Sequence, residues 1–299
     1  MNNWIFIIVS SLIALTFAAC NLNSGSTGVV KLNLTDAPID ADNVTGVYIT
    51  ITEIQYNMNR DDGETWETLE EFQGPKTYNL LELQNGKSVL LGELILTAGQ
   101  YNQIRFLLDI PEQGGAAPSN PGCYIEYSDE TTEPLFVPSG GNSGYKATGT
   151  FQVPVNGAVE LTADFDVRKA VVAAGDSGKI ILKPTIRLIA NNQAGRISGS
   201  ITGYTGENEL LVFAYESGDY SETESAEPES GESRFPNAVT STSVDDESGY
   251  QLWYLAPGEY DLVVAEYTDG TFVQVSGVIT GIAVEAEGNT SRIIDFSLF

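Results

Sequence analysis

The sequence predicts an all-β protein with two β-sandwich domains in series, placed after a signal peptide and a flexible tether. Two observations support this prediction: apolar and polar residues alternate along many short segments, and clusters of Gly, Asn and Pro separate those segments. Alternation with a period of two puts the apolar side chains on one face of a strand, as in antiparallel sheets packed on one side. Many short strands divided by turn residues favour a sandwich or a barrel.

The first twenty residues have the features of an export signal. An apolar run covers residues 4–17, which is too short for a bilayer span of about 20 residues but typical of a signal peptide. It ends in Phe17-Ala18-Ala19-Cys20, which resembles the lipobox of bacterial lipoproteins. That resemblance implies cleavage after residue 19 and a lipid on Cys20, which would hold the protein at a membrane. Phe17 replaces the usual Leu, and residues 1–3 carry no Lys or Arg. The alternative is an ordinary signal peptide cleaved near Ala19.

Residues 20–28 are rich in Asn, Ser and Gly, so we expect a flexible tether between the lipid and the first domain. The several acyl chains of a lipidated cysteine give stable anchoring. Asn21 is compatible with sorting to the outer membrane, and the tether lacks the acidic cluster that resembles a surface-export signal. The sequence therefore predicts an outer-membrane lipoprotein and leaves the leaflet open.

Composition excludes several classes of function. The chain has 41 acidic and 14 basic residues and a net charge of −27, which argues against nucleic-acid binding and against adhesion to anionic headgroups. It contains no histidine, so Ser-His-Asp and Cys-His catalysis and histidine zinc sites are excluded. With Cys20 lipidated, Cys123 has no intrachain partner and no histidine to activate it, so we expect an inert thiol.

The first domain is expected over residues 29–190. Alternation predicts strands at 30–34, 47–52, 104–108, 151–155 and 159–167, with helical turns at 80–83 and 168–173. Two long loops, 111–122 and 138–146, interrupt the pattern. Long loops in a compact domain are functional or disordered.

The second domain is expected over residues 195–299, after a boundary at 190–195. Its strand-like segments are 210–215, 250–255, 260–267 and 292–298. Pro257-Gly258 is a tight turn, so we expect the second and third of these segments to form an antiparallel hairpin. Residues 216–235 contain seven acidic and few apolar residues, which predicts a mobile loop.

Motifs in the first domain resemble the bacterial family known as domain of unknown function 4382. They are Leu-Thr-Asp-Ala-Pro at 34–38, the strand 44–51, Tyr-Asn-Leu-Leu at 78–81, Ala-Gly-Gln-Tyr at 98–101 leading into 103–109, Asp-Phe-Asp at 164–166 and Leu-Lys-Pro-Thr-Ile-Arg-Leu at 182–188. The resemblance implies an architecture and a lipoprotein context, and no activity.

The second domain resembles the carboxypeptidase regulatory-like, transthyretin-type sandwich at 195–201, 246–252 and 255–264. This implies a non-catalytic domain that braces a neighbour or presents a surface.

Two groups of side chains are candidate sites. Asp36, Asp40 and Asp42 share one loop, and carboxylates at short spacing can hold Ca²⁺, although the spacing does not match an EF-hand. The alternative is that Asp36 caps backbone N–H groups next to Pro38.

Exposed aromatic rings are the second group, because they can stack on sugars. The candidates are Trp66, Tyr124 and Tyr145, with Tyr127 and Trp253 as further possibilities. For Trp66 the alternative is a place in the core. Lys183 and Arg187 are expected to pair with nearby carboxylates.

These observations favour a non-enzymatic lipoprotein that binds or scaffolds a protein or glycan partner through loops 111–122 and 138–146. One alternative is an envelope glycoside hydrolase that works with two carboxylates. Another is an adhesin module stiffened by Ca²⁺. No other cofactor is expected.

Overall fold

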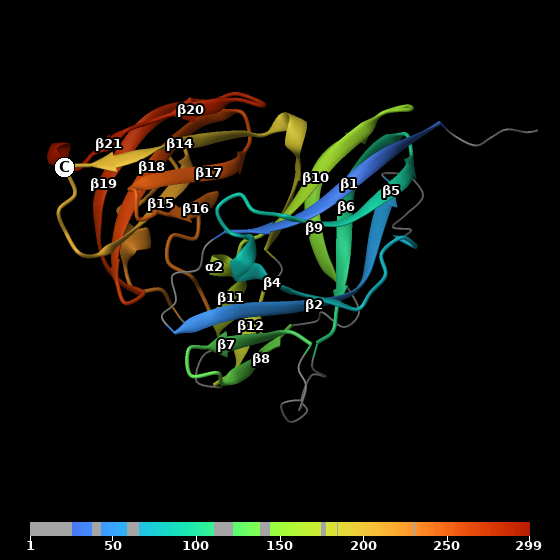
Figure 1. Cartoon of the computed structure of the whole chain (residues 1–299), viewed down its shortest axis with the longest axis horizontal. Helices are drawn as coiled ribbons and strands as arrows, with labels where there is room; N and C mark the ends of the chain where they lie inside the picture. The colour runs from blue at the N-terminus through green and yellow to red at the C-terminus, as the bar shows by residue number, and fades with distance from the viewer. Residues whose placement is uncertain are drawn as a thin grey trace, which may run out of the picture.

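The strands expected from the alternating pattern are present in the computed structural model (Figure 1). The structure describes residues 26–37, 43–58, 66–110, 122–137, 144–174, 178–183, 185–229 and 231–299. Strands dominate this part of the chain, which confirms the predicted all-β class of β-sandwich domains. The strands up to residue 190 form one sheet, and those from residue 195 onward form two more.

The described residues of the first domain form thirteen strands and short helical turns. The strands are β1 (Thr27–Asp36), β2 (Val44–Met58), β3 (Glu67–Thr68), β4 (Lys76–Asn79), β5 (Val89–Thr97), β6 (Gly99–Leu108), β7 (Tyr124–Tyr127), β8 (Thr132–Phe136), β9 (Tyr145–Val153), β10 (Ala158–Phe165), β11 (Val171–Ala173), β12 (Ile180–Leu182) and β13 (Ile186–Ala190). The turns are η1 (Leu80–Leu83), α2 (Val167–Ala170) and η3 (Asn191–Gln193). The expected turn at 80–83 is thus present, and the one at 168–173 is a single helical turn followed by β11.

These strands pair in the order β11-β12-β8-β7-β2-β6-β9-β13-β10-β1-β5, while β3 and β4 add to β2. Most pairs are antiparallel, as expected, but β1 runs parallel to β10, with Leu32 opposite Leu161. Strands β13 and β9 are also parallel, as are β12 and β8. Parallel neighbours need a long crossover, and strands β2 to β9 supply one between β1 and β10. The alternation in the sequence identifies the buried face but not the direction of the partner.

One core lies against this sheet. It includes every second residue of β1 and β10, and large side chains from β6 and β9, among them Leu32, Tyr101, Phe106, Phe151 and Phe165. Ring contacts join them: Tyr101 stacks on Phe151 with centroids 5.3 Å apart. Burial of this apolar area is the main stabilising term of the first domain.

The second domain is a sandwich of two sheets. Its strands are β14 (Gly195–Thr202), β15 (Glu209–Glu216), β16 (Thr240–Ser243), β17 (Gly249–Leu255), β18 (Gly258–Thr268), β19 (Thr271–Val284), β20 (Asn289–Ser291) and β21 (Ile294–Asp295), with η4 (Glu222–Ser225) and η5 (Phe296–Leu298). One sheet has the order β17-β14-β20, with β21 on β14, and the other has the order β16-β15-β18-β19.

Strands β15 and β18 are buried on both faces. Val212 and Val264 point into the core between the two sheets. Phe213 and Val263 point the other way, into a second cluster that also contains Phe235. This double burial explains why both strands are almost continuous apolar runs, since neither face needs polar residues.

The expected hairpin between residues 250–255 and 260–267 is wrong. Strand β17 pairs with β14 in one sheet, whereas β18 pairs with β15 and β19 in the other. The turn after Leu255 therefore carries the chain across the sandwich rather than back along its neighbour. A tight turn between two alternating strands fits both arrangements, and the sequence pattern does not separate them.

The acidic segment 216–235 is also not the free loop that its composition predicts. Asn237 and Tyr215 both donate to the Glu224 carboxylate, over 3.0 and 3.1 Å. Arg234 binds the Glu227 carboxylate over 2.7 Å. Phe235, at the end of the segment, is fully buried. The described part of this segment is therefore held against the second domain by specific contacts, and it reaches the first domain.

Candidate binding site at the domain interface

The two domains are joined by basic side chains of the first domain that donate to backbone carbonyls of the second. Arg168 donates to the carbonyl oxygens of Phe235 and Ala238 over 2.6 and 3.3 Å. Lys169 also donates to Ala238. Farther along the chain, Lys183 donates to the carbonyl of Gly231, and Arg187 donates to that of Tyr254 over 3.4 Å. These four residues are spaced along the α2–β13 region, so the contact spans a wide face.

Two buried carboxylates hold these cations in place. Asp166 Oδ2 lies 3.0 Å from Arg168 Nη2 and 3.4 Å from Lys169 Nζ. Asp164 forms an ion pair with Arg187, as the sequence predicted for that arginine. The Arg168 side chain is only 1% exposed. Lys183 differs from the expectation, because its ammonium donates to the backbone carbonyl of Gly231.

Burial has opposite effects on the acids and bases of this interface. It lowers the pKa of Lys169, and the adjacent Asp166 carboxylate opposes that change. Burial also raises the pKa of Asp36 well above its usual value of 3.8. The N–H of Val167 counteracts this by binding Asp36 Oδ1 over 3.0 Å, while the Asp164 and Asp166 carboxylates raise the pKa further.

A small polar cavity of about 10 Å³ lies where Asp36 meets the second domain. Its lining includes Asp36, Ser241 and Trp253. Asp36 Oδ2, Ser241 Oγ and Trp253 Nε1 are buried and have no protein hydrogen-bond partner within the described chain. The volume and the polar lining match the space and partners that a single buried water needs.

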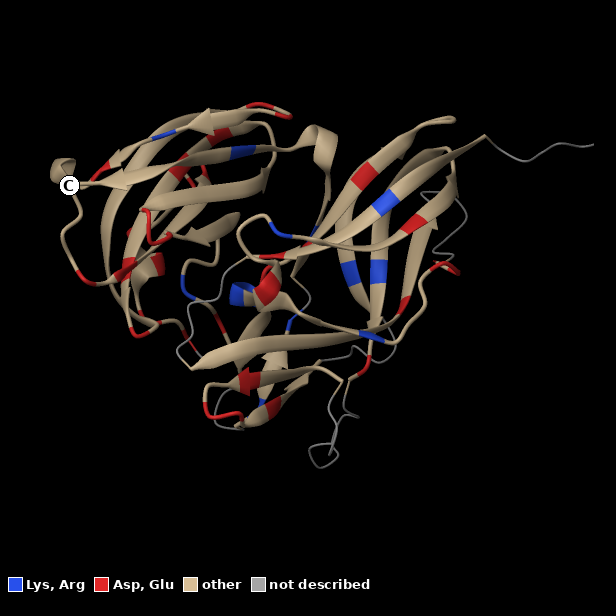
Figure 2. Ribbon diagram, viewed as in Figure 1, with Lys and Arg blue, Asp and Glu red and all other residues tan. Residues whose placement is uncertain are grey.

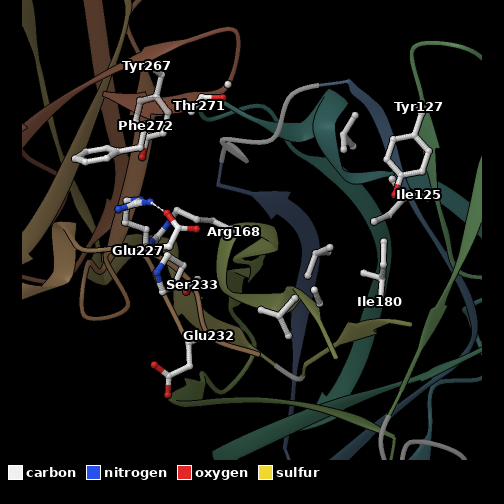
Figure 3. Close-up of a pocket in the computed structure, with 17 residues that line it drawn as sticks. Ile125, Tyr127, Arg168, Ile180, Glu227, Glu232, Ser233, Tyr267, Thr271 and Phe272 are labelled. Atoms are coloured by element: carbon white, nitrogen blue, oxygen red, sulfur yellow. Dashed lines mark hydrogen bonds and ion pairs between the residues drawn. The ribbon is translucent and has the colours of Figure 1, made fainter. Parts of the chain in front are cut away.

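A much larger cleft opens between the domains on one side of this contact, with a volume of about 520 Å³ (Figure 3). We call it the interdomain cleft. The first domain lines it with Val44, Ile125, Tyr127, Arg168 and strands β11 and β12, and the second domain with residues 227–228, 232–234, Tyr267 and residues 270–272. Volumes of 300–1,000 Å³ with mostly apolar linings and few polar groups are typical of ligand sites.

The first domain contributes an aliphatic wall to the interdomain cleft. Val44, Ile125, Val171 and Ile180 all belong to its lining. They come from β2, β7, β11 and β12, which follow one another in the order β11-β12-β8-β7-β2 at one end of the sheet. Strand β11 is the last strand of that sheet, so this wall is a sheet face that ends in an edge.

The opposite wall is aromatic and charged. The Arg234 guanidinium lies over the Phe272 ring, 4.3 Å from its centroid, and pairs with Glu227. Phe272 makes edge-to-face contact with Tyr267 at 5.7 Å. Figure 3 shows Glu227, Tyr267 and Phe272 on one side of the space, with Ile125, Tyr127 and Ile180 on the other. The cleft thus offers one arginine and a few hydroxyl and carboxylate groups around an apolar surface.

The aromatic candidates from the sequence differ in their exposure and in their contacts. Tyr145 is wrong as an exposed ligand residue, because it is fully buried and its hydroxyl donates to the carbonyl of Leu182. Tyr124 is half-buried and stacks on Tyr48 with centroids 4.6 Å apart. Trp66 is half-buried beneath the Arg105 guanidinium, 4.2 Å from its ring. None of these three lines the interdomain cleft, whereas Tyr127 does.

Most of the acidic and loop candidates cannot be compared with the structure. Asp40, Asp42, residues 111–121 and residues 138–143 lie outside the described residues. Asp36 is buried, and its carboxylate binds the Val167 N–H, so it caps backbone from a distant segment. Within the described ranges, no cluster of three or more potential metal ligands occurs. Calcium binding by this loop stays a prediction.

Sequence reasoning did not identify Arg168, Arg234 and Phe272 as site residues. Arg168 lies two residues after the Asp-Phe-Asp motif, and a basic residue close to buried carboxylates is the only local signal in the sequence.

Cys123 agrees with the expectation of an inert thiol: it is buried, and burial raises the pKa of its thiol to about 12. No helix in the described part of the chain is long and apolar enough to cross a membrane.

Comparison with known proteins identifies the first domain. A family model described as "Domain of unknown function (DUF4382)" matches residues 27–184, more than half of the chain, and confirms the resemblance drawn from the motifs. No curated protein matches the chain.

Similar solved structures include two pilins and one further bacterial protein. The Bacillus anthracis TIE protein is 10% identical with a TM-score of 0.23; the match covers 90% of this chain and 34% of that one, so this chain spans about a third of its length. The minor pilin GBS52 of Streptococcus agalactiae is 11% identical, with a TM-score of 0.21 and coverage of 89% and 94%. The shaft pilin SpaA of Lactobacillus rhamnosus GG is 11% identical, with a TM-score of 0.23 and coverage of 90% and 98%. TM-scores this low give no information on ligand or partner.

Proposed function

Because this chain belongs to the DUF4382 family, whose description names no activity, we propose its function from its own geometry: a non-enzymatic binding module of the cell envelope. The interdomain cleft is its binding surface. The observation that carries this proposal is the locked contact beside the cleft, in which Arg168 and Lys169 bind carbonyls of the second domain. A cleft between domains that are fixed to one another keeps its shape, so a partner does not have to order it on binding.

We propose that the partner is a protein that inserts apolar side chains. The wall formed by Val44, Val171 and Ile180 is aliphatic and belongs to a sheet face. Flat exposed rings would favour a sugar, but Phe272 is covered on one face by Arg234. Apolar side chains that fill such a space, with an arginine at its margin, resemble the central anchors of protein interfaces.

The second domain is proposed to act as a brace of the carboxypeptidase regulatory-like type. Its two sheets form a sandwich, and carbonyls of its segment 231–238 accept from the first domain. Without this segment the cleft would lose one wall, including Arg234. Bracing is therefore part of how the site is made.

A lipid on Cys20 is proposed to hold the module at the outer membrane, based on the residues before that cysteine. Mass spectrometry of the mature protein should show the mass of the acyl groups, and Cys20→Ala should remove it. Release of Cys20→Ala into the soluble fraction is the expected consequence. An unmodified wild-type mass would overturn the anchor.

Hydrolysis by a carboxylate pair is the competing proposal. Glu227 and Glu232 are acidic residues that line the cleft, and both are exposed. Glu227 is also paired with Arg234. The general acid of a glycosidase lies in an apolar pocket shielded from water, and an exposed carboxylate that is paired with an arginine does not. Release of reducing sugars from envelope polysaccharide that disappears in Glu227→Gln or Glu232→Gln would favour the hydrolase.

Site-specific photo-crosslinking tests the cleft. A benzophenone amino acid placed at Tyr127 points into the interdomain cleft, and the same group at Tyr124 lies on the other face of β7, against Tyr48. In intact cells we expect a discrete protein adduct from position 127 and none from 124. Ala173→Arg, an exposed cleft residue, should abolish that adduct, and Thr132→Arg on β8 should not. Equal adducts at both positions, or an adduct that survives Ala173→Arg, would refute the cleft as the binding surface.

A further inference from the structure

Three segments that are distant in sequence meet at the end of the sheet where the folded chain begins. The N–H of Asn156 donates to the carbonyl of Thr27, and the N–H of Val29 donates to the carbonyl of Gly157, both over 2.8 Å. The N–H of Ala98 donates to the carbonyl of Ser26 over 2.6 Å. The start of β1, the β5–β6 turn and the β9–β10 turn thus form one surface, which we call the tether end.

Among the described residues, the three segments that make up the tether end carry no charge, although the protein is strongly acidic. Residues 26–30, 94–104 and 147–159 contain no Asp, Glu, Lys or Arg, although these make up 18% of the chain. The opposite ends of the same strands carry Asp36, Asp164, Asp166 and Arg168. In Figure 2 the tips of β1 and β10 on that side are tan, while the blue and red residues of these strands lie farther along them. The nearest charged residues on β1, β5 and β10 are Lys31, Glu93 and Glu160, which lie opposite one another just beyond the uncharged segments.

Two large apolar side chains project from this uncharged surface. Ile95 is 69% exposed and lies opposite Val29 in the β1–β5 pair. Val155 is 60% exposed in the β9–β10 turn, next to Asn156, which binds Thr27. Both side chains therefore lie at the same end of the sheet, where exposed apolar surface can contact another molecule or a membrane.

The length of chain before β1 limits what this surface can meet. Six peptide units separate Cys20 from Ser26, the first described residue. A fully extended chain spans at most about 3.3–3.6 Å per residue, so a lipid on Cys20 keeps the tether end within about 20 Å of the bilayer.

We propose that the tether end rests on the bilayer that holds the lipid, with the Ile95 and Val155 side chains inserted at the headgroup level. This inference depends on the lipid anchor of the proposed function. A protein with a net charge of −27 is repelled by anionic headgroups, and its uncharged segments approach them with less repulsion than the rest of the surface. Insertion of a few apolar side chains beside an acyl anchor adds to its hold on the membrane.

The docked orientation also places the interdomain cleft. Val44 begins β2, and Tyr127 and Arg168 lie at the same end of the sheet as Val44, away from Thr27. Figure 1 shows β7, β11 and β12 on the opposite side of the first domain from the start of β1. Resting on the tether end would direct the cleft away from the membrane.

Spin-label depth measurements on the mature, lipidated protein test this proposal. Single labels are placed through Val155→Cys and Ile95→Cys, with Cys20 acylated and Cys123 buried. The matched control is Leu90→Cys, which is 52% exposed on the same strand as Ile95. Five residues of β-strand separate the two positions by about 17 Å. The protein is reconstituted in vesicles of phosphatidylethanolamine and phosphatidylglycerol, and collisions with oxygen and with a soluble nickel chelate are compared.

We expect the oxygen-to-nickel collision ratio to rise at 95 and 155 on reconstitution and to stay constant at 90. A protein that fails to float with the vesicles would refute the anchor itself. A protein that floats, but shows the same ratio at all three positions, would refute the docked orientation and leave the anchor intact. Dipolar broadening at 155 without vesicles would show that a second copy covers this surface, and that result too would overturn the proposal.

Discussion

Arg168 Nη1 lies 2.6 Å from the carbonyl oxygen of Phe235, and this bond joins the helical turn of the first domain to the second. The same guanidinium binds Asp166 and lies over the Phe213 ring, 5.4 Å from its centroid. Its acceptors in the second domain are backbone carbonyls, whose position depends on the path of the chain rather than on side-chain identity. The shape of segment 231–238 is therefore what the first domain recognises.

Removing this guanidinium should destabilise both domains. Arg168→Met keeps most of the volume but leaves the buried Asp166 carboxylate with the Lys169 ammonium beside it, and three carbonyls lose the guanidinium as a donor. Breaking a buried ion pair from one side costs about 3–5 kcal/mol. We expect a loss of this size in the free energy of unfolding by urea. Lys31→Met breaks an exposed pair with Glu93 and should cost less than about 1 kcal/mol. Equal losses in the two variants would show that the Arg168 contact contributes no more than a surface pair.

Asp36→Asn should stabilise the protein in a pH-dependent way. Because the pKa of Asp36 is raised in the folded state, the folded protein binds its proton more tightly than the unfolded chain. Asp36 therefore makes its most favourable contribution below its unfolded value, and this contribution is lost as pH rises toward the folded pKa. The Asn side chain retains an acceptor for the Val167 N–H without a titratable proton.

The measurement is the difference in melting temperature between Asp36→Asn and the wild type from pH 4 to pH 8. It should be smallest near pH 4 and increase with pH until the folded pKa is passed. Asp129→Asn serves as the control, because Asp129 is exposed and its pKa is lowered by bonds to Thr131. Its substitution should not stabilise at any pH in this range. A difference for Asp36→Asn that falls as pH rises would contradict the raised pKa.

Cys123 should resist alkylation while the protein is folded. Burial raises the pKa of its thiol to about 12 and hides it from reagents. Only the thiolate is the nucleophile, so labelling by iodoacetamide at pH 8 should be at least about a hundredfold slower than in urea. Intact-mass spectrometry over time gives the rate. Rapid labelling of Cys123 in the native protein would contradict this burial.

The sequence predicted the strands better than their partners. Alternation from Val159 to Val167 identified the strand β10 and its buried face, because the side chains of a strand have a fixed period. It did not reveal that β10 lies parallel to β1, since direction depends on the connection rather than the pattern. Tyr145 shows the same limit: it was expected among the exposed rings, but its ring is buried and its hydroxyl donates to the carbonyl of Leu182 inside the core. The sequence did not identify Arg168 as a site residue, because the carbonyls to which it donates lie more than sixty residues away along the chain.

A close approach between Gly86 and Trp253 gives a further test of the domain contact. Gly86, in the turn after η1, has a φ of +78°, and a Cβ there would lie 2.4 Å from the indole ring of Trp253 in the second domain. Gly86→Ala therefore meets both an unfavourable left-handed backbone and a collision across the interface. The backbone effect alone costs about 1–2 kcal/mol for a residue with a Cβ.

Gly178→Ala separates these two effects. Gly178 has a φ of +66°, and nothing lies within 4 Å of a Cβ built there, so its substitution carries the backbone cost without a collision. We expect Gly86→Ala to lose more free energy of unfolding in urea than Gly178→Ala, because the Trp253 ring has to move and the contact next to Ser241 opens. Faster proteolysis within the 231–238 segment should accompany the larger loss. If both variants lose the same free energy of unfolding, the Trp253 ring moves aside at no energetic cost. The domain contact beside the interdomain cleft would then be less tightly packed than the hydrogen bonds of its basic side chains indicate.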